Sequence, residues 1–121
     1  MGSYKDLEIY KRAYDLAIRI HKASLKMPQF EMYEQGSQIR RSSKSTKDTI
    51  VEGYGRRRYK AEYIRYLVFS QASCDEANNQ SITINELYPE IKEFLEIEKD
   101  LDILGKMINN YISFVETNWR S

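Results

Sequence analysis

The sequence has little of the chemistry on which most catalytic and metal sites depend. It holds one cysteine, Cys74, and one histidine, His21. A lone cysteine excludes an intramolecular disulfide and fits a reducing compartment, and its small helical neighbours favour a core residue over a reactive thiol. His21 would need carboxylates alone as co-ligands of a metal, and Ser42, Ser43 and Ser45 have no base in helical reach. We therefore expect no metal, no cofactor and no enzymatic activity.

Long apolar runs and a secretion signal are also missing. No stretch approaches the ~18 apolar residues that cross a bilayer. The first ten residues, MGSYKDLEIY, have no apolar signal region. We expect a cytoplasmic protein without membrane contact, built as one domain over residues 1–121, which is long enough to bury a core without disulfides or metals.

Charge is balanced overall but separated along the chain. The net charge is +1, yet nine basic and three acidic residues lie between positions 40 and 65, and nine acidic and two basic residues lie between 75 and 102. A basic segment can attract a polyanion even when the whole chain is neutral. The acidic segment is typical of a solvated helix face, with a specific site for a basic partner as the less favoured reading.

Apolar and small residues recur every three or four positions, which predicts helices with one buried face. The predicted helices cover about residues 6–26, 34–54, 60–86 and 89–118. Short connections make consecutive helices antiparallel, so the fold class is all-α, an antiparallel up-down-up-down four-helix bundle.

Each helix has its own expected core positions. In the first they are Leu7, Tyr10, Tyr14, Ala17, His21 and Ser24, with Ile9, Ala13, Leu16 and Ile20 widening the stripe. In the second they are Ile39, Ser43, Thr46 and Ile50. In the third they are Tyr63, Leu67, Ser70, Cys74, Ala77, Ser81 and Ile84, and in the fourth Phe94, Ile97, Leu101, Leu104, Ile108, Tyr111 and Val115. The second helix buries so little apolar area that it should depend on its neighbours for order.

Proline marks two of the predicted helix boundaries. Pro28 ends the first helix, and Phe30, Met32 and Tyr33 after it are expected to pack on the core. Pro89 is expected in the first turn of the fourth helix, where its missing N–H costs nothing.

Glycine gives further local predictions. Gly53 and Gly55 are expected to be left-handed caps that end the second helix. Gly105 lies inside the fourth helix at a cost of about 1 kcal/mol against alanine, which indicates a close helix crossing.

Basic and aromatic residues interleave around the end of the second helix. Cations beside aromatic rings suit single-stranded nucleic acid, because they bind its phosphates and stack on its bases. The tyrosines are Tyr54, Tyr59, Tyr63 and Tyr66. The candidate nucleic-acid-binding residues are Arg40, Arg41, Lys44, Lys47, Arg56, Arg57, Arg58, Lys60 and Arg65. The plainer alternative is that these charges only keep helix ends soluble.

Two segments of the second helix carry a distinctive motif, residues 37–41 (SQIRR) and residues 49–56 (TIVEGYGR). The motif resembles the central signature of the 23S rRNA intervening sequence proteins, a four-helix bundle family that also takes in the accessory variability determinants of diversity-generating retroelements. Further similarity lies at residues 4–10, 63–67 and 104–109. The resemblance is collinear over essentially the whole chain.

The resemblance implies a bacterial homo-oligomer, a ring-like pentamer with a basic central surface, and nucleic-acid binding. For the retroelement members it also implies a reverse-transcriptase partner. The chain departs from the family at residues 42–47, where a common Ala-Ala-Val-Ser-Ile-Pro is replaced by SSKSTK. The replacement removes a proline and adds Lys44 and Lys47, which favour a polyanion over a dry protein contact.

We therefore expect a non-enzymatic oligomer that binds RNA or single-stranded DNA through the basic surface of the second helix and the connection after it, largely without sequence preference. The alternative is a protein-interaction scaffold or accessory subunit, for example of a reverse transcriptase, whose basic face contacts an acidic protein.

Overall fold

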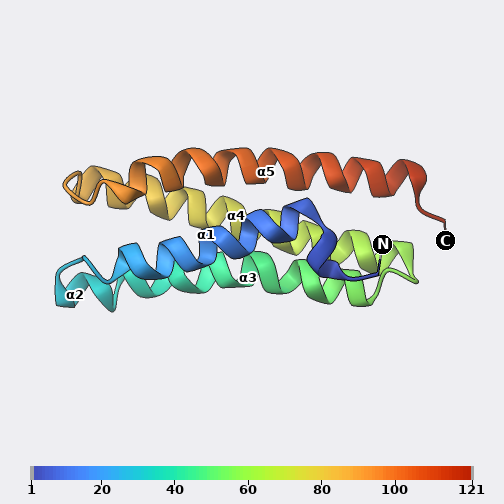
Figure 1. The fold of residues 1–121 in the computed structure, drawn as a ribbon, viewed down its shortest axis with the longest axis horizontal. Helices are drawn as coiled ribbons and strands as arrows, with labels where there is room; N and C mark the ends of the chain where they lie inside the picture. The colour runs from blue at the N-terminus through green and yellow to red at the C-terminus, as the bar shows by residue number, and fades with distance from the viewer. Residues whose placement is uncertain (1, 121) are drawn as a thin grey trace.

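The computed structural model describes residues 2–120, which form helices and connections without a strand. The elements are η1 (Tyr4–Asp6), α1 (Glu8–Ser24), α2 (Gln29–Met32), α3 (Gln35–Gly55), α4 (Lys60–Leu87) and α5 (Glu93–Asn118). Figure 1 shows the four long helices side by side, with successive long helices running in opposite directions. The all-α four-helix bundle expected from the sequence is confirmed.

The four long helices form a ring in which α1 and α4 are diagonal. Each of these two helices packs against both α3 and α5. The two termini and the α3–α4 connection lie at one end of the bundle, and α2 and the α4–α5 connection lie at the other (Figure 1). We call these the terminal end and the α2 end. Residues far apart in the sequence therefore meet at the terminal end.

The cores of α4 and α5 follow the predicted spacing. All seven predicted positions of α4 are buried, as are six of the seven in α5. The exception is Tyr111, which is half-buried and shares a hydroxyl–hydroxyl hydrogen bond of 2.8 Å with Tyr63. Because a buried phenol hydroxyl needs a partner, this pair lets two tyrosines join an otherwise apolar core.

The buried face of α3 consists mainly of small residues, as the sequence predicted. Hydroxyl groups tie α3 to α4. Ser42 Oγ donates to Gln80 Oε1 at 2.6 Å, and Ser70 Oγ donates to the Thr46 carbonyl at 2.7 Å. α3 is therefore held by close approach and hydrogen bonds more than by large apolar side chains.

The buried face of α1 is centred on aliphatic residues rather than on the tyrosines of the predicted stripe. Ile9, Leu16 and Ile20 are at most 4% exposed, whereas Tyr14 is 49% exposed. The helical period allows two overlapping stripes here, and tyrosine can lie at the edge of a core with its hydroxyl in water. The expectation that Tyr14 belongs to the core is wrong.

Two expectations for the connections at the α2 end are also wrong. Phe30 and Tyr33 are 69% and 70% exposed, because the short helix α2 turns them outward while Met27 packs on the core instead. Pro89 lies in a turn before α5 and not in its first helical turn. The chain needs that turn to reverse direction, and buried Ile91 anchors it.

The expectation that the glycines of α3 are left-handed caps is also wrong. Gly53 and Gly55 are both helical residues of α3, and neither has a positive φ. Gly53 is needed for space, since a Cβ there would lie 3.0 Å from Tyr66 Cβ on α4. Gly105 does face α4, but a Cβ there would lie at an ordinary 3.7 Å from Gln71 Nε2.

Candidate functional site

The nine candidate cations fall into two groups, which we call the α3 group and the connection group. Helical rise places Arg40 and Arg56 about 24 Å apart along the axis of α3. The α3 group is Arg40, Arg41, Lys44 and Lys47, and the connection group is Arg56, Arg57, Arg58, Lys60 and Arg65. Only the connection group lies at the terminal end, so the nine residues do not form one compact patch.

Arg40 is a structural residue. Its guanidinium is half-buried, with Nη1 donating to Ser24 Oγ at 2.8 Å and Nη2 donating to the Met32 carbonyl at 3.0 Å. These bonds fasten the end of α1 and the end of α2 to α3. Because these bonds hold its guanidinium inside the fold, Arg40 is less open to a ligand than Arg41, and we leave it out of the proposed surface.

The rest of the α3 group is more open to solvent. Arg41 is exposed and donates through Nη1 to Ser37 Oγ at 3.1 Å. Lys47 is only 22% exposed in its side chain and pairs with Asp48 at 2.7 Å. Lys44 is exposed and has no ion-pair partner among residues 2–120. Arg41 and Lys44 therefore remain available to a ligand, and Lys47 is largely neutralised.

Three arginines of the connection group lie over aromatic rings. The guanidinium carbon of Arg57 is 3.9 Å from the centroid of Tyr54, and that of Arg56 is 4.7 Å from the centroid of Tyr66. Arg65 lies 5.3 Å from the centroid of Phe69. Contacts of this kind hold a cation in place without cancelling its charge. All three arginines are exposed, so their positions are partly fixed before any ligand arrives.

Acidic and carbonyl groups take up part of this positive charge. Glu62 pairs with Arg56 at 3.5 Å and with Arg65 at 3.4 Å. Lys60 Nζ donates to the Glu116 carbonyl at the end of α5 at 2.7 Å, where the helix dipole favours a cation. Arg58 is exposed and has no ion-pair partner among the described residues. Arg57 and Arg58 are thus the strongest remaining anion-binding groups of the connection.

Only some of the interleaved tyrosines can stack on a base. Tyr54 and Tyr63 are 6% and 0% exposed, and burial together with the hydrogen bond to Tyr111 raises the pKa of Tyr63. Both are core residues, as the spacing along α4 predicts for Tyr63, so neither ring is open to a base. Tyr59 is 62% exposed beside Arg58, which makes it the one interleaved tyrosine with a largely open ring.

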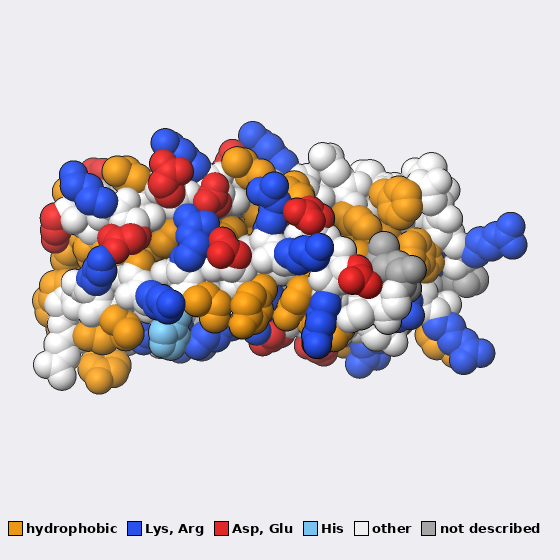
Figure 2. Space-filling view, viewed as in Figure 1, with side chains coloured by type: hydrophobic (Ala, Val, Ile, Leu, Met, Phe, Trp, Pro, Cys, Tyr) orange, Lys and Arg blue, Asp and Glu red, His pale blue; other side chains and the backbone are white. Residues whose placement is uncertain are grey.

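The sequence reasoning missed the part that other segments play at the terminal end. Figure 2 shows Lys and Arg side chains projecting from this end. Lys5 of η1 lies near the ring of Tyr4, and Trp119 after α5 donates through Nε1 to the Arg57 carbonyl at 2.8 Å. Trp119 is the only tryptophan and follows the last helical stripe, which is the one signal that could have marked it.

Several acidic residues lie at the α2 end. Glu31, Glu34, Glu86, Glu90 and Glu93 all lie in or beside its connections. Lys26 donates a hydrogen bond to Glu93 and holds the pKa of that carboxyl below its ordinary value. Lys26, Arg40, Arg41 and Lys92 lie at the same end, so its surface carries charges of both signs.

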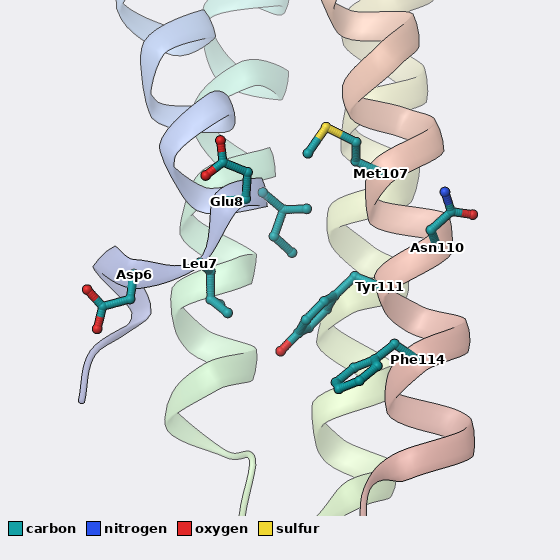
Figure 3. A pocket seen from close by; sticks show the side chains of 8 residues that line it. Asp6, Leu7, Glu8, Met107, Asn110, Tyr111 and Phe114 are labelled. Carbon is teal, nitrogen blue, oxygen red and sulfur yellow. The ribbon is translucent and has the colours of Figure 1, made fainter. Parts of the chain in front are cut away.

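An apolar groove runs between the start of α1 and the last part of α5 (Figure 3). The rings of Tyr111 and Phe114 stack there with centroids 5.7 Å apart. In Figure 3 the carboxylates of Asp6 and Glu8 point away from these rings. The groove thus offers apolar contact area and no converging acid and base.

The chemically reactive side chains are occupied elsewhere. Cys74 is fully buried, its Sγ lies 3.5 Å from the Leu101 carbonyl, and burial raises the pKa of the thiol to about 12. Its prediction as a core residue is confirmed. Within residues 2–120 no group of three His, Cys, Asp or Glu side chains is placed to hold a metal ion, and no helix is long and apolar enough to span a membrane.

Comparison with known proteins gives a family. The family model described as 23S rRNA-intervening sequence protein matches residues 5–110. The chain belongs to this family. None of the curated proteins compared with it matches.

The motif that resembles the signature of the 23S rRNA-intervening sequence proteins has a structural role here. Ile39 and Ile50 are fully buried, Arg40 binds the ends of α1 and α2, and Gly53 admits α4. Of its cations, Arg41 and Arg56 alone face solvent. Most residues of the motif therefore stabilise the packing of the bundle, and the charged surface depends mainly on residues outside the motif.

Proposed function

We propose that this 23S rRNA-intervening sequence protein is a non-enzymatic oligomer that binds RNA or single-stranded DNA through its terminal end. The binding surface consists of Arg56, Arg57, Arg58, Tyr59 and Arg65. Arg41 and Lys44 extend it along α3. The observation that carries the proposal is the run of three exposed arginines next to an exposed tyrosine in the α3–α4 connection.

The chemistry of this surface favours binding to the phosphate backbone of a nucleic acid over recognition of its base sequence. Guanidinium groups make paired hydrogen bonds to phosphate, and aromatic rings stack on any base. The surface has no inserted helix or strand to read the edge of a duplex groove. Binding is therefore electrostatic and largely independent of sequence, with Tyr59 giving a preference for unpaired bases.

The outer face of α4 supports self-association. Val68, Phe69 and Ile82 are 47%, 41% and 48% exposed, although the opposite face of α4 already forms the core. They alternate with Arg65, Asp75 and Glu76 on the exposed side of the helix, a mixture of apolar and charged groups that is common where protein surfaces associate. We propose that a second copy covers this face, and the family resemblance makes a homopentamer the expected assembly.

The test is the salt dependence of binding. Fluorescence anisotropy with a labelled single strand of mixed sequence should show affinity that falls linearly on a log–log plot of affinity against salt. Removing one protein–phosphate ion pair should reduce the slope by about 0.7 for a single strand, so Arg58→Gln and Lys44→Gln should each flatten it. Binding that is absent at 50 mM salt, or independent of salt, would refute the proposal.

The acidic segment between positions 75 and 102, with nine acidic and two basic residues, favours a second candidate, a scaffold or accessory subunit. In that case the terminal end binds an acidic protein surface, such as the face formed by residues 86–102 of another copy, or a reverse transcriptase. Arg58→Gln and Lys44→Gln would then dissociate the assembly, which light scattering would show without any nucleic acid present. An oligomer that keeps its mass while losing nucleic-acid affinity would exclude this candidate.

A further inference from the structure

Trp119 holds the α3–α4 connection against the end of α5. Its Nε1 donates to the Arg57 carbonyl at 2.8 Å, and its ring packs edge-on against Tyr63 with centroids 5.2 Å apart. The backbone N–H of Trp119 bonds to the Val115 carbonyl at 2.9 Å, so the tryptophan is itself fixed by the last turn of α5. The connection is therefore braced from a third helix as well as from the two that it joins.

A second contact ties the same two segments together. Lys60, the first residue of α4, donates through Nζ to the Glu116 carbonyl at 2.7 Å. The two bonds thus run in opposite directions. Trp119, after α5, donates to the connection, and Lys60, at the start of α4, donates to α5. Each bond also gives a partner to a carbonyl that has none within a helix. The Arg57 carbonyl lies in the connection, and the Glu116 carbonyl lies in the last turn of α5.

The position of the brace bears directly on the arginines. Arg57 is held at two points. Its guanidinium donates to the Tyr54 carbonyl at 2.9 Å, and its own carbonyl accepts the hydrogen bond from Trp119. Arg58 follows at once, and among residues 2–120 no side chain or carbonyl holds its guanidinium in this way. The direction in which Arg58 leaves the surface therefore depends on the backbone that Trp119 holds.

We propose that Trp119 is a positioning residue that pre-organises the connection arginines for a polyanionic ligand. The inference rests on the proposed function and adds a residue beyond the matched region, which ends at residue 110. Binding an already ordered loop avoids the entropy cost of ordering it at the moment of contact. Loss of the brace should weaken binding by about threefold to tenfold, the amount expected for immobilising one or two long side chains.

The decisive variant is Trp119→Phe, which keeps an aromatic ring next to Tyr63 and removes the N–H donor with the pyrrole part of the indole. The matched control is Tyr111→Phe, which removes a different hydrogen bond at the same end, the one to Tyr63 Oη. Hydrogen–deuterium exchange of peptides covering residues 56–60 reports the brace without any ligand. Anisotropy with a labelled single-stranded RNA at several salt concentrations reports its effect on binding.

Trp119→Phe should speed exchange in residues 56–60 and weaken RNA binding with an unchanged salt slope, because no charge is lost. Tyr111→Phe should leave both readouts as in the wild type, even if it lowers the melting temperature. Unchanged exchange in Trp119→Phe would overturn the brace, and faster exchange with unchanged affinity would overturn its role in binding. A wild-type protein that binds no RNA at low salt refutes the proposed function instead, and the exchange result still decides the brace.

Discussion

Three glycine-to-alanine substitutions test how α3 and α5 meet α4 and how α3 ends. Alanine in a helix interior gains about 0.8–1 kcal/mol over glycine when the added methyl group has room. At Gly105 it has room, because the nearest atom, Gln71 Nε2, would lie 3.7 Å away. Gly105→Ala should therefore raise the free energy of unfolding by about 0.5–1 kcal/mol, or the melting temperature by about 2–5 °C.

The same change at Gly53 should have the opposite sign. The methyl group would lie 3.0 Å from Tyr66 Cβ and 3.4 Å from Tyr63 Cδ1. A Cβ is fixed to the α4 backbone, so rotating the Tyr66 side chain cannot relieve the clash and the helices must separate. Overpacking of this kind costs about 1–3 kcal/mol. After subtraction of the helix-propensity gain, Gly53→Ala should destabilise the bundle by up to about 2 kcal/mol.

The substitution at Gly55 tests whether this residue is helical or is a left-handed cap. A left-handed glycine loses about 1 kcal/mol when it becomes alanine, whereas Gly55 is helical with no atom near its missing Cβ. Gly55→Ala should be neutral or slightly stabilising. Urea unfolding followed by circular dichroism measures all three variants under one set of conditions. A stabilising Gly53→Ala, or a Gly55→Ala that loses about 1 kcal/mol, would refute the account of this helix end.

The other predictions concern Arg40, the outer face of α4 and Cys74. Arg40→Met should lower the free energy of unfolding by about 1–3 kcal/mol, because two hydrogen bonds to other segments are removed, and should leave the salt slope of RNA binding unchanged; a flatter slope would return Arg40 to the interface. Val68→Lys combined with Ile82→Lys should reduce the mass seen by light scattering while helix content is kept; an unchanged mass would show that α4 is not the subunit interface. Burial raises the pKa of Cys74 from 9.0 to about 12, so the unfolded chain loses its thiol proton first and stability should fall as pH rises from about 9 toward 12. Cys74→Ala should remove part of that fall in urea titrations at several pH values, and a wild-type stability that is flat over this range would contradict the burial of the thiol.

The fold could be predicted from the sequence because its strongest signal is spacing. In α4 the seven predicted positions are the buried ones, even though Ser70 and Ser81 are among them. Small hydroxyl residues were placed correctly because they lie on the same stripe as Tyr63 and Leu67. Spacing failed in α1, where a tyrosine stripe and an aliphatic stripe overlap and only packing decides which one faces inward.

The candidate site was less predictable, because charge in a sequence does not show which groups the fold itself uses. Arg40 and Arg41 are adjacent and look equivalent, yet a helix turns them about 100° apart. This difference in direction sends Arg40 into the contacts with Ser24 and the Met32 carbonyl and leaves Arg41 exposed. The contribution of Trp119 could not be seen either, since it arises only where the end of α5 meets the connection.

Polar side chains fix the register in which α4 packs, although the helix carries apolar side chains on its exposed side as well as in the core. On the α5 side, amides seven residues apart donate to α5 carbonyls: Gln71 to Gly105 at 3.0 Å, Asn78 to Glu98 at 3.2 Å and Asn85 to Phe94 at 2.9 Å. On the α3 side, hydroxyls form the corresponding bonds. A purely apolar contact between two helices tolerates a shift of one helical turn along the axis. A row of amides, each bonded to a particular carbonyl of the other helix, does not, because the shift would leave part-buried donors unpaired. The register in turn fixes where the end of α5 meets the α3–α4 connection, so the position of the arginine surface depends on polar contacts formed along the whole length of α4.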